Sequence, residues 1–316
     1  MIPQKLNIAN TPTPIQKHNF NSCAFYIKRD DLTGVELTGN KIRKLEYLLY
    51  DAKKNQADYI FTTGGDQSNH ARATVIAAKM LGFKTKLFLW GKEKTNPDGN
   101  LFLDKVFGTE IQYLTKEEFF NVDEIMNREK EKCEKKGIKV YEVPAGGSSP
   151  LGIWGYINFV NELKNQIDIK NIKGIFASSG SGGTAAGLLV GISLLNLNLK
   201  VFAVNVLLPK KELQDYIFSI TDECVKKYKL NIKIKKENLE ILDGYSSEGY
   251  KNIFPEKINV IKSFAYQSGI LFDPTYTGKA FFAYNDLFLK GKKNNNILFV
   301  HTGGIFGIFS KRKDYL

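Results

Sequence analysis

The stretch IFASSGSGGTAAGLLVG, residues 175–191, decides the fold. An apolar run rich in β-branched and aromatic residues leads into a loop of glycine and serine, and this loop leads into an apolar helix. Such a loop offers several backbone N–H groups, and the helix N-terminus adds a partial positive charge. The segment therefore predicts a strand, a phosphate-binding loop and a helix in succession. A tight turn without a ligand is the alternative for this loop taken alone.

Short strand-like runs alternate with helical patterns on both sides of this unit. The runs are AFYIK (24–28), ADYIFTT (57–63), KTKLFLW (84–90), EIQYL (110–114), IKVYEV (138–143), IKGIFAS (172–178), LKVFAVNVL (199–207) and NNILFVH (295–301). One predicted helix, at 41–55, places Ile42, Leu45, Leu49 and Ala52 on one face, and another, at 68–82, places Ala73, Ile76, Ala77 and Met80 on one face. This alternation is typical of an α/β protein with mostly parallel sheets.

The chain is long enough for two domains. Its 316 residues exceed the roughly 150 that one domain commonly takes. The turn-rich segment VPAGGSSPLG (143–152) separates two groups of α/β units. We therefore predict a small α/β domain at residues 43–155 and a large α/β domain made of residues 1–42 and 156–316.

Composition limits the location of the protein and its partners. No apolar run reaches the roughly 18 residues of a membrane span, and the start MIPQKLNIANTPTPIQ does not resemble a signal peptide. The three cysteines form no CxxC pair, and the three histidines lack metal-ligand spacing. We expect a cytoplasmic protein with reduced thiols, no membrane association and no dedicated metal site.

The net charge of +12 would permit a nucleic-acid partner. The lysines, however, lie in solvated runs such as EKEKCEKKGIKV, where they alternate with glutamate, and no RNP, zinc-finger or basic-zipper pattern occurs among them. We therefore expect no nucleic-acid binding. A basic surface could still attract a small anionic substrate or a phosphate-bearing cofactor.

The loop at residues 179–185 also satisfies the dinucleotide pattern G-x-G-x-x-G/A. A dinucleotide site would need an acidic residue about 20 positions later, at the end of the next strand. The sequence has Asn205 there. The hydroxyl groups of Ser179, Ser181 and Thr184 suit a terminal phosphate monoester better than a pyrophosphate.

Two further glycine-rich loops follow predicted strands. The loop TTGGDQSNH (62–70) puts Ser68 and Asn69 at a helix N-terminus, where they could cap the helix or hold an anion. The loop FVHTGGIFG (299–307) puts Thr302 at the carboxyl edge of a sheet, where α/β proteins bind ligands. Three such loops predict a ligand crevice. None of them matches the Walker A motif, so nucleotide hydrolysis is not expected.

Five motifs in order carry a family resemblance. They are KRDDLTGVELTGNKIRKLEYLL (28–49), TGGDQSNHARAT (63–74), SSGSGGTAAG (178–187), DPTYTGKA (273–280) and HTGG (301–304). With these motifs, over about residues 10–310, the chain resembles the D-cysteine desulfhydrase and 1-aminocyclopropane-1-carboxylate deaminase family, which are fold-type-II pyridoxal-phosphate (PLP) enzymes related to the tryptophan synthase β subunit. The resemblance implies a large and a small α/β domain with PLP between them, in a homodimer.

The resemblance also implies roles for the residues that hold the cofactor. Lys41 matches the lysine that carries PLP as a Schiff base, and Lys44 matches a residue close to the phosphate. Asn69 matches the residue at the phenolic oxygen, and Thr302 matches a hydroxyl residue beside the pyridine nitrogen. The phosphate cradle corresponds to Ser179, Gly180, Ser181, Gly182, Gly183 and Thr184.

On the substrate side, the resemblance assigns three consecutive residues and two tyrosines. Ser68 matches the serine on the substrate side, which is placed to bind the substrate carboxylate or to act in ring opening. Asn69 and His70 beside it are assigned to substrate binding. Tyr276 and Tyr250 match two active-site tyrosines, although Tyr250 could also serve only in the core or at the surface.

Three positions separate the two activities of the family. The deaminase pattern reads QSNQ, VYEG and HLGG, whereas this chain reads QSNH, TYTG and HTGG, with His70, Thr277 and Thr302 at the differing positions. We therefore expect β-elimination of a small amino acid, with D-cysteine giving pyruvate, ammonia and sulfide. The alternatives are 1-aminocyclopropane-1-carboxylate deamination, elimination on another β-substituted D- or L-amino acid, and a non-catalytic ligand-binding protein.

Some residues depart from the family pattern. Thr38 replaces a glycine before Gly39, and Ala185 replaces a histidine after the phosphate loop. Asp66 replaces an isoleucine before the QSN triplet. A carboxylate at position 66 could favour a cationic substrate side chain or repel an anionic one, so it bears on the choice of substrate.

Overall fold

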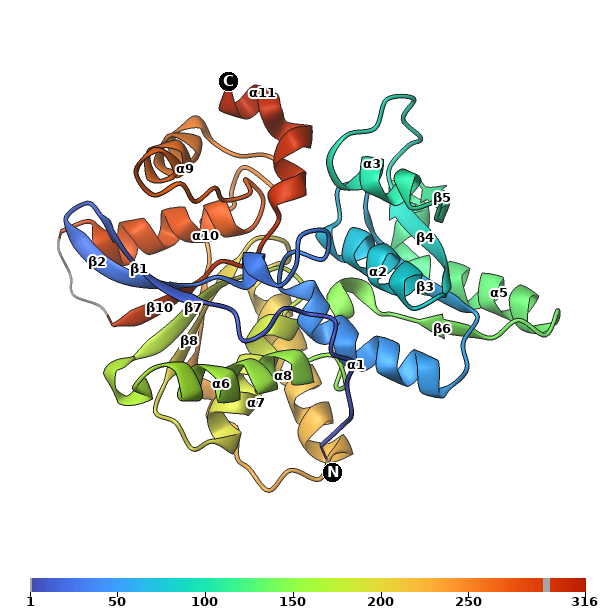
Figure 1. Ribbon diagram of the computed structural model, residues 1–316, viewed down its shortest axis with the longest axis horizontal. Helices are drawn as coiled ribbons and strands as arrows, with labels where there is room; N and C mark the ends of the chain where they lie inside the picture. The colour runs from blue at the N-terminus through green and yellow to red at the C-terminus, as the bar shows by residue number, and fades with distance from the viewer. Residues whose placement is uncertain (1, 292–295) are drawn as a thin grey trace.

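Two sheets organise the computed structural model, which describes residues 2–291 and 296–316 (Figure 1). One sheet has six strands in the order β1-β2-β10-β7-β8-β9, and the other has four in the order β5-β4-β3-β6. Every neighbouring pair is parallel except β1 and β2, which are antiparallel. The predicted α/β class with mostly parallel sheets is confirmed. The predicted run at 295–301 begins at a residue outside the described ranges.

The six-stranded sheet carries helices on both faces. Its strands are β1 (Ile15–Phe20), β2 (Cys23–Lys28), β10 (Ile297–Val300), β7 (Gly174–Ser179), β8 (Lys200–Asn205) and β9 (Leu239–Leu242). The helices α6 (Trp154–Gln166), α7 (Gly183–Leu194) and α8 (Lys210–Lys227) cover one face, and α9 (Pro255–Ser268) and α10 (Thr277–Tyr284) cover the other (Figure 1). The chain ends in α11 (Arg312–Tyr315).

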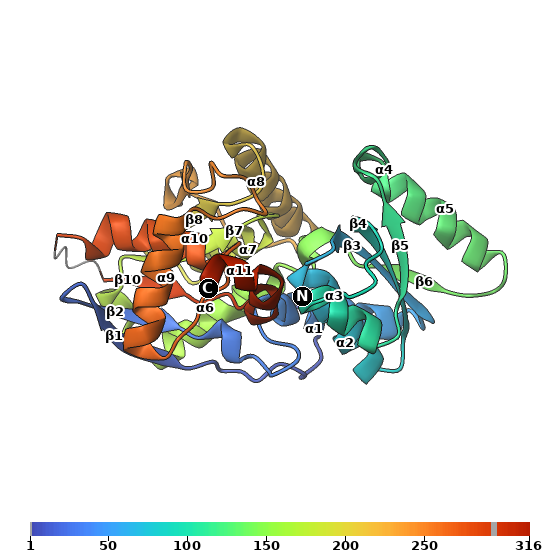
Figure 2. The same cartoon turned by 90° about the horizontal axis from the view of Figure 1, so that it is seen from above.

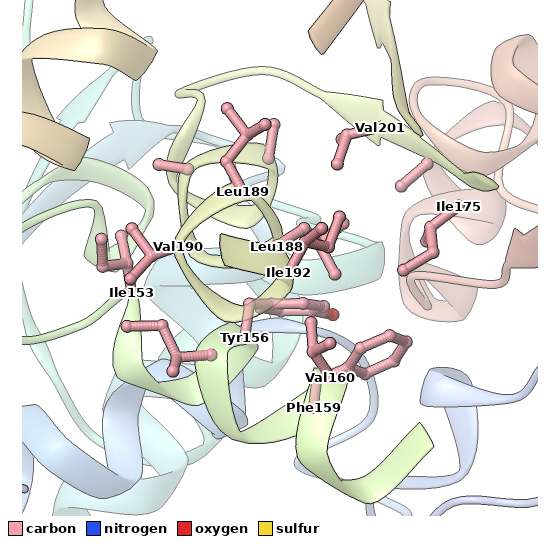
Figure 3. Close-up of a cluster of buried hydrophobic side chains, with 14 of the residues drawn as sticks. Ile153, Tyr156, Phe159, Val160, Ile175, Leu188, Leu189, Val190, Ile192 and Val201 are labelled. Atoms are coloured by element: carbon pink, nitrogen blue, oxygen red, sulfur yellow. The ribbon is translucent and has the colours of Figure 1, made fainter. Parts of the chain in front are cut away.

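Helix α7 lies at the centre of the core on the α6 side of this sheet. Leu188, Leu189, Val190 and Ile192 of α7 pack among Tyr156 and other residues of α6 and the strands (Figure 3). Its sequence is apolar on all sides, as expected for a helix without a solvent-facing stripe. A side chain at Gly187 would bring its Cβ within 2.5 Å of the Ile153 carbonyl oxygen, so a glycine at that position allows α6 to approach closely.

The four-stranded sheet is built from the part of the chain between β2 and β7, which are both strands of the six-stranded sheet. Its strands are β3 (Tyr59–Gly65), β4 (Lys84–Trp90), β5 (Glu110–Leu114) and β6 (Val140–Glu142). Its helices are α1 (Lys41–Lys54), α2 (Asn69–Met80), α3 (Gly99–Val106), α4 (Lys116–Phe120) and α5 (Val122–Glu134). Helices α1 and α2 pack on one face and α5 lies on the other (Figure 2).

One expectation about α2 is wrong. Ala73, Ile76 and Ala77 are buried as predicted, but Met80 is 61% exposed. The helix is buried from His70 to Ala78 and ends at Met80, so its last turn lies at the surface. The face predicted for α1 is confirmed, because Ile42, Leu45, Leu49 and Ala52 are all buried.

The remaining local elements are short turns of helix. The 3-10 turns are η1 (Asp30–Leu32), η2 (Ala145–Gly147), η3 (Ile169–Asn171), η4 (Lys236–Asn238) and η6 (Ile305–Lys311), and η5 (Asn285–Leu289) is a π-helical turn. No helix within the described ranges combines the length and apolarity needed to cross a membrane. The domain boundaries at 43 and 155 remain a prediction. All strands of the four-stranded sheet lie between them, and all strands of the six-stranded sheet lie outside.

Candidate active site

A small cavity, called the inner cavity below, lies at the carboxyl ends of β7 and β10. Its lining residues are Asn40, Lys41, Lys44, Asn69, Ser178, Ser179, Gly180, Ser181, Gly182, Gly183, Thr184, Tyr276, Thr302 and Gly303. The structure thus brings together every residue predicted to bind the cofactor, together with Tyr276. The other predicted site residues, Ser68, His70 and Tyr250, do not line this cavity.

Lys41 enters the inner cavity from the first position of α1. The turn before it is docked on the loop after β10, since the Asn40 N–H donates to the Thr302 carbonyl at 3.0 Å. Gly39 has φ +108°, and a Cβ there would lie 2.9 Å from the same carbonyl oxygen, so the turn requires glycine. Burial lowers the pKa of Lys41 to about 8. A larger fraction of this amine is therefore neutral and nucleophilic near neutral pH than of an ordinary lysine.

The loop between β7 and α7 forms a cradle of backbone N–H groups at a helix N-terminus. It passes through Gly182 at φ +75°, and α7 begins at the next residue. A Cβ on Gly183 would lie 2.8 Å from Lys44 Nζ, so this glycine leaves space for the ammonium group. The buried Ser179 Oγ has no hydrogen-bond partner among the described residues. Because buried hydroxyls are normally paired, Ser179 points to a missing polar ligand.

Lys44 supplies a second amine beside the cradle. Its Nζ donates to the Gly146 carbonyl at 3.1 Å and lies 3.5 Å from Ser148 Oγ. Burial, together with the nearby charge of Lys41, lowers the pKa of Lys44 well below its usual value. A bound anion in the cradle would offset this effect, because a negative charge favours the protonated amine.

Three hydroxyl groups form a chain that reaches the inner cavity at Ser178 and Thr302. Thr302 Oγ1 lies 3.0 Å from Ser178 Oγ and 3.0 Å from Thr277 Oγ1, and Thr277 also donates to the Gly303 carbonyl at 3.1 Å. All three residues are buried. The chain presents neutral hydroxyls, and none of its members is a carboxylate.

The N-terminus of α2 brings in residues from the four-stranded sheet. The Ala71 N–H donates to Ser68 Oγ at 3.1 Å, so Ser68 caps the helix as predicted. Asn69 lines the inner cavity, and its Oδ1 accepts from Asn100 Nδ2 at 2.9 Å. Asn100 is itself held by Gln67, whose Oε1 accepts the Asn100 N–H at 3.0 Å. Asn100 was not predicted as a site residue, because it lies far from the motif and matches no local signal.

His70 does not line the inner cavity, and its ring contacts Thr62. Its Nε2 lies 3.0 Å from Thr62 Oγ1, behind the loop, and the ring is buried. Burial, with the charges of Lys41 and Lys44, lowers the pKa of His70 well below its usual value, so the ring is neutral at physiological pH. The assignment of His70 to substrate binding stays a prediction.

An outer cavity adjoins the inner one, and the two share Asn69 and Tyr276. Its lining also includes Tyr250, whose hydroxyl is hydrogen-bonded to that of Tyr276, with ring centroids 5.6 Å apart. Burial raises the pKa of Tyr250 to about 12 and that of Tyr276 well above its usual value. Both phenols are therefore protonated at neutral pH.

Asp273 fixes the position of Tyr276 and was missed in the sequence analysis. Its carboxylate accepts the N–H groups of Thr275 at 3.0 Å, Tyr276 at 2.8 Å and Thr277 at 2.8 Å. Burial raises the pKa of Asp273, and these hydrogen bonds oppose the shift. The Asp-Pro pair that opens DPTYTGKA, just before a helix, was the signal that could have identified it.

Asp66 lines the outer cavity, but it is already paired with two lysines. Lys94 Nζ lies 2.7 Å from Asp66 Oδ2, and Lys251 Nζ lies 3.2 Å from Oδ1. Burial opposes ionisation of Asp66, but the hydrogen bonds and charges of Lys94 and Lys251 outweigh it and lower the pKa. Asp66, Lys94 and Lys251 together therefore carry a net positive charge. The expectation that Asp66 favours a cationic side chain therefore loses its electrostatic basis.

Comparisons with known proteins give one matching family and several similar proteins. The family model described as pyridoxal-phosphate dependent enzyme matches residues 6–303. A Thermotoga maritima protein named "Putative 1-aminocyclopropane-1-carboxylate deaminase" is 41% identical, over 98% of this chain and 99% of that protein. The mitochondrial bifunctional D-cysteine desulfhydrase/1-aminocyclopropane-1-carboxylate deaminase of Arabidopsis thaliana is 34% identical, over 96% of this chain and 79% of that protein. A crystal structure of an ACC deaminase homologue has a TM-score of 0.90 and 36% identity, and covers 99% of this chain and 95% of that one.

Proposed function

The chain belongs to the pyridoxal-phosphate-dependent enzymes, among the relatives of D-cysteine desulfhydrase and 1-aminocyclopropane-1-carboxylate deaminase, and from this premise we propose that it catalyses β-elimination of a small β-substituted amino acid. D-cysteine is the proposed substrate. With one water, it gives pyruvate, ammonia and sulfide.

The residues present fit PLP. The cradle at the start of α7 and the unpartnered Ser179 hydroxyl suit the phosphate, with Lys44 as a cationic neighbour. Lys41 provides an amine with a lowered pKa in the same cavity. Asn69 and Thr302 line it as well, which supports the roles proposed for them at the phenolic oxygen and the pyridine nitrogen.

When bound, PLP supplies an electron sink for the negative charge that develops at the substrate α-carbon. We assign removal of the α-proton to Lys41 Nζ, because its pKa near 8 allows a neutral amine at physiological pH. Tyr276 is a poorer base, since burial keeps its phenol protonated. Tyr250 and Tyr276 have one hydroxyl hydrogen each, and the hydrogen bond between the two hydroxyls uses one of these hydrogens. The other can be donated to the departing thiolate.

Ser68 is proposed to hold the substrate carboxylate. Its oxygen accepts the Ala71 N–H, and its own hydrogen stays available for donation. The positive end of α2 would add to this attraction.

The choice of β-elimination rests on the hydroxyl chain of Ser178, Thr302 and Thr277. A hydroxyl cannot hold a proton on the cofactor ring as a carboxylate would, so the electron sink is weaker. A weaker sink suits a reaction in which a β-leaving group promptly removes the electrons.

The test is product analysis on the PLP-loaded protein. D-cysteine should yield pyruvate and sulfide in equal amounts, and Lys41→Ala should abolish both turnover and the visible absorbance of bound cofactor. A colourless protein that takes up no PLP, or a loaded protein that releases no oxoacid from D-cysteine, would contradict the proposal.

A second candidate is deamination of 1-aminocyclopropane-1-carboxylate, which the name of the Thermotoga relative favours. Its product is 2-oxobutyrate, so parallel assays with the two substrates separate the reactions. A panel of other β-substituted D- and L-amino acids extends the same assay.

We also propose that the protein is a cytoplasmic homodimer, on the basis of the family resemblance. Each chain is proposed to have a small domain at 43–155 and a large domain at 1–42 plus 156–316, because the two sheets are separate. Sedimentation should give twice the 35.7 kDa chain mass.

A further inference from the structure

A buried cluster of three charged side chains lies behind the tyrosine pair. It consists of Lys257 in α9, Lys279 in α10 and Glu248 in the segment between β9 and α9. Lys257 Nζ lies 2.7 Å from Glu248 Oε2, and Lys279 Nζ lies 3.7 Å from Glu248 Oε1. The side chains are at most 4% exposed. Two cations and one anion are thus removed from water, an arrangement that is costly and gives little stability by itself.

The two ammonium groups also bind the main chain of one segment, residues 244–251. Lys257 Nζ donates to the Tyr245 carbonyl at 2.6 Å, and Lys279 Nζ donates to the Gly249 carbonyl at 2.7 Å. Lys279 also lies 3.5 Å from the Tyr250 carbonyl. The segment contains turns but no helix or strand, so these contacts with α9 and α10 do much to fix its backbone.

The same segment delivers Tyr250 to the outer cavity. Tyr276, its hydrogen-bond partner, is the N-cap residue of α10, and Lys279 follows three positions later in that helix. Helix α10 therefore positions both tyrosines. It carries Tyr276 at its N-cap, and its Lys279 contacts the backbone carbonyls of Gly249 and Tyr250. A displacement of either tyrosine would break the contact between their hydroxyls.

We propose that Lys279, Lys257 and Glu248 are positioning residues that hold the Tyr250 hydroxyl against Tyr276 for proton donation at the substrate. This inference rests on the proposed function of the tyrosine pair. None of the three charged side chains lines the inner cavity, so their effect on turnover passes through the segment that carries Tyr250.

The first test compares kcat for pyruvate release in PLP-loaded wild type and Lys279→Met. We expect a fall of about tenfold to a hundredfold, because misplacement of a catalytic group by roughly 1 Å has an effect of this size. The content of bound PLP should be unchanged. Lys211→Met is the matched control, because it removes an ammonium group that is 88% exposed in an ion pair on α8. An unchanged kcat in Lys279→Met would overturn the proposal.

A double-mutant cycle distinguishes positioning from general destabilisation. In a Tyr250→Phe background, Lys279→Met should lower kcat by less than about twofold, because the hydroxyl that it positions is already gone. An equal loss in both backgrounds would overturn the proposal. If Lys279→Met does not fold, Glu248→Gln replaces it in the double-mutant cycle with Tyr250→Phe, because the glutamine keeps the shape of the side chain and removes its charge.

Amide hydrogen exchange on the PLP-loaded protein without substrate gives a readout independent of turnover. Residues 244–251 should exchange faster in Lys279→Met and should be unaffected in Lys211→Met. Unaltered exchange in Lys279→Met would overturn the positioning role. If no amino acid yields an oxoacid, the proposed function fails, and the exchange experiment still decides whether the cluster holds this segment.

Discussion

Lys41 differs from a surface lysine in the cost of keeping its ammonium group charged. It opens α1 at the wall of the inner cavity, and burial lowers its pKa to about 8. In an unfolded chain the same amine would have a pKa near 10.5. The folded apoprotein therefore holds a proton on Lys41 at pH 7 at the expense of stability.

We predict that Lys41→Met stabilises the apoprotein at pH 7. Between pH 8 and 10.5 the unfolded wild-type chain binds a proton that the folded chain has released, so wild-type stability rises relative to the variant. The advantage of the variant should shrink across this interval. Denaturant unfolding at pH 7, 8, 9 and 10.5 measures the difference. Lys211→Met serves as the exposed control, and a difference that does not change with pH would contradict the prediction.

Asp66 illustrates how partners change the effect of a charge. We predict that Asp66→Asn raises kcat/KM for an amino acid with a β-sulfonate, relative to the uncharged β-chloroalanine, because it leaves the charges of Lys94 and Lys251 uncompensated. About a threefold to fivefold change is expected for partly exposed charges, and added salt should reduce it. Asp215→Asn is the control in an exposed pair. An unchanged ratio would show that the two lysines do not reach the substrate.

At the scale of residues, the sequence identified side chains whose roles depend on local motifs. Lys41 and Ser179 lie within such motifs, and the structure brings both to the inner cavity. Lys257 and Lys279 were not recognised as buried ion-pair partners. Lys257 lies in no motif, and the motif DPTYTGKA, which contains Lys279, drew attention only to its tyrosine and threonine. Their common partner, Glu248, is distant in sequence from Lys279 and meets it only in the folded protein.

Among the elements, α1 depends on its contact with α6. A Cβ at Gly155 would lie 2.5 Å from the Arg43 carbonyl carbon and 2.8 Å from the Lys44 N atom. The glycine therefore allows α6 to pack against the backbone of the turn that carries Lys41 and Lys44. The position of α1 relative to the phosphate cradle depends on this close approach.

We predict that Gly155→Ala destabilises the protein by about 1–3 kcal/mol, the usual cost of overpacking, despite the better helix propensity of alanine. It should also weaken PLP binding, because α1 must move away from α6. Unfolding in urea and titration of the apoprotein with PLP measure the two effects. Asn161→Ala on the exposed face of α6 is the control. Wild-type stability in Gly155→Ala would contradict the proposed role of the glycine.

The elements that the sequence analysis found are those with a strong apolar pattern. Two strands were not predicted: β1, whose sequence IQKHNF mixes polar and apolar residues, and β9, which has only four residues. The motif GNKIRK (39–44) predicted cofactor binding and a helix with Ile42 on its apolar face, but no role for Arg43. Arg43 of this motif is buried and binds Asp30 at 2.8 Å and Glu162 at 2.8 Å, which joins α1 to the end of β2 and to α6. Such partners are set by the tertiary structure and have no local signature.

Across the whole molecule, the site joins the two sheets. The cradle begins where β7 of the six-stranded sheet ends, while Asn69 begins α2 after β3 of the four-stranded sheet. The ion pair between Lys251 and Asp66 makes a further connection at the outer cavity. A ligand that contacts both parts should therefore stabilise them together.

We predict that PLP protects the N-termini of both α7 and α2 from amide hydrogen exchange, whereas inorganic phosphate protects only that of α7. PLP bound as proposed would reach from the cradle to Asn69, whereas phosphate alone would fill only the cradle. At a free concentration of 100 times its Kd, PLP should stabilise the folded protein by about 2.7 kcal/mol, which raises Tm. Exchange measured with and without each ligand, with the exposed helix α5 as an internal reference, tests this. Two outcomes would contradict this coupling of the two sheets by PLP. One is protection of the α2 N-terminus by phosphate alone, and the other is a lack of protection of the α2 N-terminus by PLP.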